Sequence, residues 1–67
     1  MTSFDCSKNE RIETPEHILK FFDEIEAVCR KHGLSIGHED GEGAFQIEPF
    51  RESNIKWLRE ANIDFRE

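Results

Sequence analysis

Apolar residues between Thr14 and Gly33 recur at the spacing of one helical face. They are Ile18, Phe21, Phe22, Ile25, Val28 and Cys29. Steps of three and one residues are typical of an amphipathic helix. Thr14 suits the N-cap and Pro15 the first helical position, while Gly33 supplies the usual C-terminal stop. The pattern therefore predicts a helix that begins after Thr14 and ends at Gly33.

The next stretch alternates apolar with small or polar residues on both sides of a Gly-rich connection. The apolar positions are Leu34, Ile36, Phe45 and Ile47. A period of two is the pattern of β-strands, and the Asp40-Gly41 pair between the two runs is a favoured turn dipeptide. Pro49 is expected to end the second strand. A β-hairpin with one apolar face is therefore predicted.

A second helix is predicted from Ser53 or Asn54 onward. One face would carry Ile55, Leu58 and Ala61, continued by Asn62 and Phe65 if the helix persists. Trp57 lies at the edge of this stripe, and Ile63 falls outside it.

Together these elements predict an α+β fold in the order helix–β-hairpin–helix. Residues 1–13 are mostly polar and are interpreted as an N-terminal arm, and residues 14–67 as a single α-β-β-α domain. We expect both helices to cover one face of a single-layer sheet, so that the Phe-rich stripe packs on the apolar face of the hairpin. A two-stranded sheet is marginal alone and its edges are open to pairing, so a dimer is an alternative to a monomer.

Composition narrows the classes of partner. Nine basic and fifteen acidic residues give a net charge of -6, which argues against direct binding to nucleic acid or to an anionic membrane. No apolar run approaches the roughly 20 residues of a membrane span, and the N-terminus lacks the cationic start and apolar core of a signal peptide. We expect a cytoplasmic protein whose two cysteines are free thiols.

Few residues offer metal or catalytic chemistry. Cys29, His32 and His38 are weak candidates for metal ligands, which Cys6 or His17 could complete. Cys29 and His32 already have a structural role at the end of the first helix, and a thiol on a buried face is usually inert. No catalytic residue, metal or cofactor is therefore predicted, and the protein is not expected to be an enzyme.

Two surface regions are candidates for contact with a partner. The first is the tip of the hairpin, formed by His38, Glu39, Asp40 and Glu42. The second is a mixed aromatic and cationic patch of Lys56, Trp57 and Arg59. Loops and exposed Trp residues often carry binding contacts. The alternatives are an ordinary solvated turn and a Trp57 side chain that is used in the core or in a dimer.

The segment from His32 to Phe50, followed by Asn54 to Leu58, resembles small uncharacterised bacteriophage-encoded proteins. Those proteins carry the block H-G-L-S-I-x-H-E-D, then G-A-F-x-I-E-P, and then a helix with N-I-x-W-L. The likeness extends over about Ile18 to Leu58 and excludes the first thirteen residues. It implies a phage origin and a location in the cytoplasm of the bacterial host.

The expected function is therefore that of a non-catalytic phage accessory protein that binds a host protein. Its effect would be to inhibit or redirect a bacterial defence or nucleic-acid-processing factor. Two alternatives come from other classes. One is a module that sequesters a small ligand or a metal, and the other is an acidic mimic of nucleic acid, although basic residues interrupt the acidic ones.

Overall fold

The computed structural model describes residues 1–38 and 43–66. Within these residues the chain forms two helices and two antiparallel hairpins. The elements are β1 (Thr2–Asp5), β2 (Glu10–Glu13), α1 (Glu16–His32), β3 (Leu34–His38), β4 (Phe45–Pro49) and α2 (Glu52–Arg59). The α+β class is confirmed. The element order begins with a hairpin, however, and so differs from the predicted helix–hairpin–helix.

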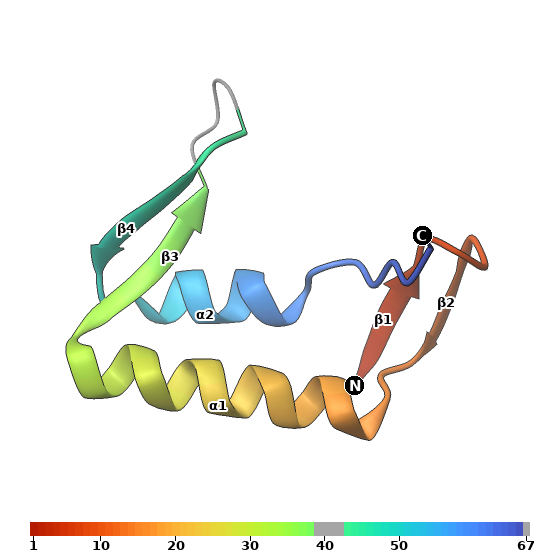
Figure 1. Cartoon of the computed structure of the whole chain (residues 1–67), viewed down its shortest axis with the longest axis horizontal. Helices are drawn as coiled ribbons and strands as arrows, with labels where there is room; N and C mark the ends of the chain where they lie inside the picture. Colours follow the sequence, from red (N-terminus) through yellow and green to blue (C-terminus); the bar gives the residue numbers. More distant parts are fainter. Residues whose placement is uncertain (39–42, 67) are drawn as a thin grey trace.

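The two helices lie side by side and run in opposite directions (Figure 1). The β1–β2 hairpin rises from the end where α1 begins, and the β3–β4 hairpin rises from the end where α1 stops. Both hairpins lie on the same side of the helix pair.

The predicted first helix is present, but its N-terminal cap is not Thr14. Pro15 occupies the cap position without a side-chain hydrogen bond. The Thr14 hydroxyl is buried and shares a 2.6 Å hydrogen bond with the Ser3 hydroxyl, so it is engaged with β1 rather than with the helix. Gly33 ends the helix as predicted, with a left-handed φ of 68° and its N–H donating to the Cys29 carbonyl.

Residues 1–13, predicted to be a polar arm, contain the β1–β2 hairpin. The expectation of an irregular segment was wrong because these strands have only four residues each and are mostly polar, so they show little alternation. Ser3 pairs with Ile12 in the antiparallel register. Asn9 adopts a positive φ of 54° in the connecting turn, a conformation that Asn tolerates better than most residues.

The segment after α2 returns to β1 and does not continue the helix. The Ile63 N–H donates to the Phe4 carbonyl at 2.8 Å, and the Cys6 N–H donates to the Ile63 carbonyl at 2.7 Å. Ile63 is consequently buried, whereas Phe65 is exposed. The predicted extension of the helical stripe to Phe65 was therefore wrong, because α2 ends at Arg59.

The β3–β4 hairpin turns the opposite face inward from the one predicted. Ser35 and Gly37 are buried. The residues expected in the core, Leu34, Ile36, Phe45 and Ile47, are all exposed. Each pair of neighbours across the two strands lies on one face, with Ile36 opposite Ile47 and Ser35 opposite Glu48. The smaller, more polar face therefore meets the rest of the molecule.

A polar cluster explains this choice of face. The Asn54 side-chain amide on α2 donates to Ser35 Oγ and to Glu48 Oε1, both at 2.9 Å, and Ser35 Oγ donates to the Pro49 carbonyl at 2.9 Å. Gly37 makes room for the cluster, because a methyl group there would collide with the Glu48 carboxylate. Small side chains let α2 approach β3 closely, and the hydrogen bonds satisfy the polar groups that are covered.

The core is small. The buried apolar side chains are Phe22, Cys29, Ile55 and Ile63. They come from α1, α2 and the C-terminal segment, and none comes from β3 or β4. Much of the apolar surface of the chain is thus left outside the core. No helix in the described part of the chain is long and apolar enough to cross a membrane.

Candidate functional site

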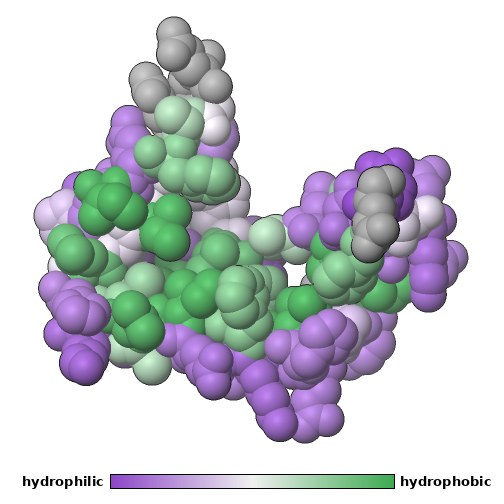
Figure 2. All heavy atoms as spheres, viewed as in Figure 1, coloured by the Kyte–Doolittle hydropathy of each residue, from purple (hydrophilic) through white to green (hydrophobic). Residues whose placement is uncertain are grey.

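An apolar groove runs between α1 and the outward face of the β3–β4 hairpin. Its volume is about 420 Å³. The apolar side chains that line it are Phe21, Ile25, Val28, Leu34, Ile36 and Ile47. Figure 2 shows apolar residues gathered across the centre of this side of the molecule and continuing onto the hairpin, with hydrophilic residues along the lower edge. We call this feature the apolar groove.

The apolar groove is unusual because the side chains that line it are exposed to solvent. Phe21 and Val28 are each 56% exposed, and Ile47 is 69% exposed. Single exposed apolar residues are common on soluble proteins, but a contiguous set that lines one groove is typical of an interaction surface. The groove walls are a helix and a two-stranded sheet, so the side chains are held on regular elements.

A second hollow, which we call the aromatic pocket, lies on the other side of Ile36. It has a volume of about 360 Å³ and contains residues of both the hairpin and α2. The His38 imidazole lies 5.4 Å from the Trp57 ring and 6.1 Å from the Phe45 ring, centroid to centroid. Both rings meet the imidazole nearly at right angles, at 84° and 81°. Ile36 lines both hollows and joins them.

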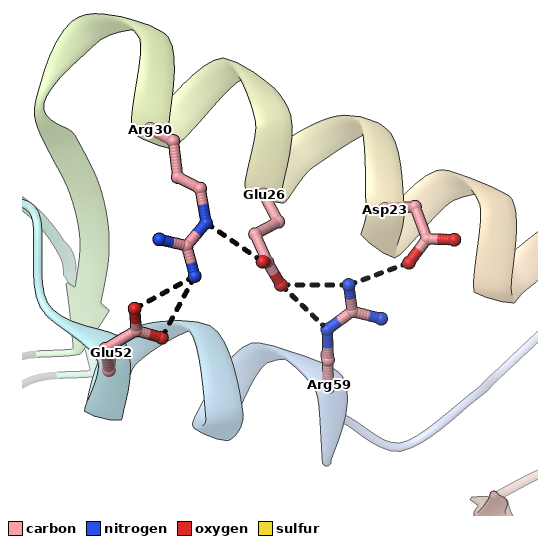
Figure 3. Close-up of polar contacts among 5 residues, drawn as sticks. All are labelled: Asp23, Glu26, Arg30, Glu52 and Arg59. Atoms are coloured by element: carbon pink, nitrogen blue, oxygen red, sulfur yellow. Dashed lines mark hydrogen bonds and ion pairs between the residues drawn. The ribbon is translucent and has the colours of Figure 1, made fainter.

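An ion-pair network holds α2 against α1 (Figure 3). Glu26 accepts from Arg30 Nε at 3.0 Å and from Arg59 Nη2 at 2.9 Å. Arg30 also bonds Glu52, and Arg59 also bonds Asp23. Hydrogen bonds from Arg59 and then Arg30 lower the pKa of Glu26 below its ordinary value. Arg30 on α1 pairs with Glu52 on α2, and Arg59 on α2 pairs with Asp23 and Glu26 on α1. These pairs cross between the helices in both directions and define their relative position.

The structure brings together some of the predicted partner-binding residues and separates others. His38 and Trp57, from the two different predicted regions, are in contact. Arg59 does not form a patch with Trp57, because its guanidinium bonds Asp23 and Glu26 on α1. Lys56 is exposed. The other three residues of the predicted hairpin tip, Glu39, Asp40 and Glu42, lie outside the described residues.

The three weak metal candidates do not gather at one place. Cys29 is buried at 7% exposure, and both Cys29 and His32 are among the residues that line the apolar groove. His38 instead lines the aromatic pocket. Over residues 1–38 and 43–66, no three His, Cys, Asp or Glu side chains gather as a metal site. The second free thiol, Cys6, is half-buried beside the C-terminal segment.

The residues of the apolar groove were missed as functional candidates because the sequence assigned them to the core. Hydrophobic periodicity identifies the apolar face of an element but not which face its neighbours cover. A signal was nevertheless present: Ser35 and Gly37 form a small face on β3 that permits closer helix packing than Leu34 and Ile36 do.

Comparisons with known proteins found no relative of this chain. No protein-family model matches the chain, and neither a curated protein nor a solved structure matches it significantly.

Proposed function

We propose that this chain is a non-catalytic bacteriophage accessory protein that binds a host bacterial protein through the apolar groove. The proposed effect is to inhibit or redirect a defence or nucleic-acid-processing factor of the host. The observation that carries the proposal is the exposed apolar lining of the groove, led by Phe21, Val28 and Ile47. The phage origin and the class of host target come from the resemblance of residues 18–58 to small phage proteins.

The shape of the groove favours a protein partner over a small molecule. Sites for small ligands enclose most of the ligand surface, whereas this groove is open along one side, and its Phe21 and Ile47 side chains are more than half exposed. Protein interfaces typically combine an apolar centre with a polar rim. Here Glu24 and His32 border the apolar residues, which matches that arrangement.

Charge favours a partner other than a second copy. Each chain carries a net charge of -6, so two copies repel each other at low salt, whereas a basic surface on another protein is attracted.

The proposal is tested by capture followed by reconstitution. Tagged wild-type chain is used to capture proteins from bacterial lysate, the captured protein is identified by mass spectrometry, and its affinity is measured with purified components. The informative variant is Val28→Glu, which places a charge inside the groove. Ala27→Glu is the matched control, because Ala27 is exposed on the same helix and does not line the groove.

We expect the wild-type chain and Ala27→Glu to bind the same protein with equal affinity, and Val28→Glu to bind about tenfold more weakly or worse. Equal binding by Val28→Glu would show that the groove is not the contact surface. Failure of the wild-type chain to capture any protein above background would refute the binding proposal itself. If light scattering shows a wild-type dimer that Val28→Glu converts to a monomer, the groove is instead a self-association interface.

A further inference from the structure

The aromatic pocket has features that the apolar groove lacks. Three aromatic side chains line it, His38, Phe45 and Trp57, together with the carboxylate-bearing Glu60. Phe45 is 78% exposed and Trp57 is 50% exposed. Large rings that are this accessible contribute little to the core of the free protein, so their gathering in one hollow needs another explanation.

The ring geometry suits the recognition of a cation. Trp57 and Phe45 each meet the His38 imidazole nearly at right angles, so neither ring stacks face to face on it. Aromatic walls of this kind attract a cation through the negative potential of their ring faces, and Trp is the strongest of them. The volume of about 360 Å³ accommodates the end of a long side chain.

The surrounding charge has the matching sign. Glu60 lines the pocket, and among the described residues no ion pair holds its carboxylate. The nearest basic residues on α2 do not fill the pocket, since neither Lys56 nor Arg59 is among its lining residues. Arg59 is held by Asp23 and Glu26 with its side chain 22% exposed. The pocket is thus aromatic, acidic at its border and not occupied by a cation of its own helix.

We propose that the aromatic pocket receives an arginine side chain of the partner protein. The proposal depends on the proposed function, because it assigns the chemistry of one contact within that interface. Arginine is preferred to lysine since its planar guanidinium stacks on an aromatic ring and still donates hydrogen bonds to a carboxylate. Glu60 is the acceptor that the pocket offers, and Trp57 is the stacking surface.

A direct test uses a blocked single amino acid as the probe. N-acetyl-arginine amide is titrated into the isotopically labelled wild-type chain. The matched probe is N-acetyl-citrulline amide, which keeps the length and shape of arginine but carries no charge. Amide shifts and the Trp57 indole N–H are followed by NMR. We expect arginine to shift the resonances of His38, Phe45 and Trp57 in a saturable manner, and citrulline to shift them much less.

Two variants assign the effect to the pocket. Trp57→Leu is expected to weaken arginine binding about fivefold, and Glu60→Gln about threefold. If Trp57→Leu does not fold, Glu60→Gln decides, because it changes only the charge. Equal shifts from citrulline, shifts located outside the pocket, or unchanged affinity in Glu60→Gln would overturn the proposal. None of these outcomes would refute the proposal that the groove binds a host protein. That proposal is tested separately, by capture from lysate and by the affinity of Val28→Glu.

Discussion

Phe21 and Phe22 are consecutive on α1, with ring centroids 6.3 Å apart, yet they face opposite environments. Phe22 is 4% exposed and belongs to the core, whereas Phe21 is 56% exposed and lines the apolar groove. The two residues illustrate two roles of the apolar residues in this chain. Some stabilise the fold in the core, and others are exposed at the surface.

This difference gives a matched pair of substitutions. Phe22→Ala is expected to lower the free energy of unfolding by about 3 kcal/mol, because it removes a large buried ring and leaves a cavity. Phe21→Ala is expected to change it by less than about 1 kcal/mol, because the removed ring is largely in water. Urea unfolding followed by circular dichroism measures both. Similar losses for the two variants would contradict the separation of core from groove.

The cluster that holds the hairpin face inward makes a second prediction. Asn54→Ala removes the donor to Ser35 and Glu48 and leaves these partly buried groups without it. The expected loss is about 1–2 kcal/mol of unfolding free energy. The control is Ser53→Ala on the same helix, since Ser53 is exposed. If the two variants unfold at the same urea concentration, the cluster does not determine the orientation of the hairpin.

The carboxylate at the centre of the ion-pair network predicts a dependence on pH. The pKa of Glu26 is below its ordinary value of 4.5 because Arg59 and Arg30 donate to the ionised form. Its contribution to stability is therefore present above about pH 4.5 and is lost as the pH falls through the lowered pKa.

Glu26→Gln is expected to melt a few degrees below the wild-type chain at neutral pH. The difference should shrink as the pH is lowered from 4.5, because the wild-type carboxylate is then also neutral. Thermal melts of both chains across this range provide the measurement. A difference that stays constant down to acid pH would indicate that Glu26 stabilises the helices by packing and not by its charge.

The C-terminal segment predicts a pattern of hydrogen exchange. The Cys6 N–H is protected only by the Ile63 carbonyl, whereas the Gly33 N–H closes the end of α1. Ile63→Ala removes part of a buried side chain. It is expected to lower the free energy of global unfolding by about 2–3 kcal/mol. The Cys6 amide should then exchange much faster, relative to the Gly33 amide, than in the wild-type chain. Equal acceleration at both amides would show that the segment opens only with the whole protein.

Local patterns in the sequence were sufficient for some elements and not for others. The first helix and its stop at Gly33 follow from periodicity and from the conformational freedom of glycine, which are local properties. The β3–β4 hairpin was predicted at the correct place, but its inward face was not, because that face depends on Asn54 from a helix later in the chain. The aromatic pocket was not predicted, because His38 and Trp57 were assigned to two separate candidate regions that the fold brings together.

The N-terminal hairpin and the burial of Ile63 escaped prediction for a related reason. Strands β1 and β2 have four residues each, and β1 bonds to Ile63, which is distant in sequence from Phe4. Non-local contacts of this kind leave no period in the sequence. They can be inferred only when the partner segment is known.

The bridge between Asp5 and Ile63 has a kinetic consequence. It joins positions near the two ends of the described chain, so forming it closes a loop that contains both helices and the β3–β4 hairpin. The entropic cost of closing a loop grows with its length, whereas the turns of α1 and the two hairpins close over short distances. We therefore expect the bridge to be among the last native pairings to form during folding.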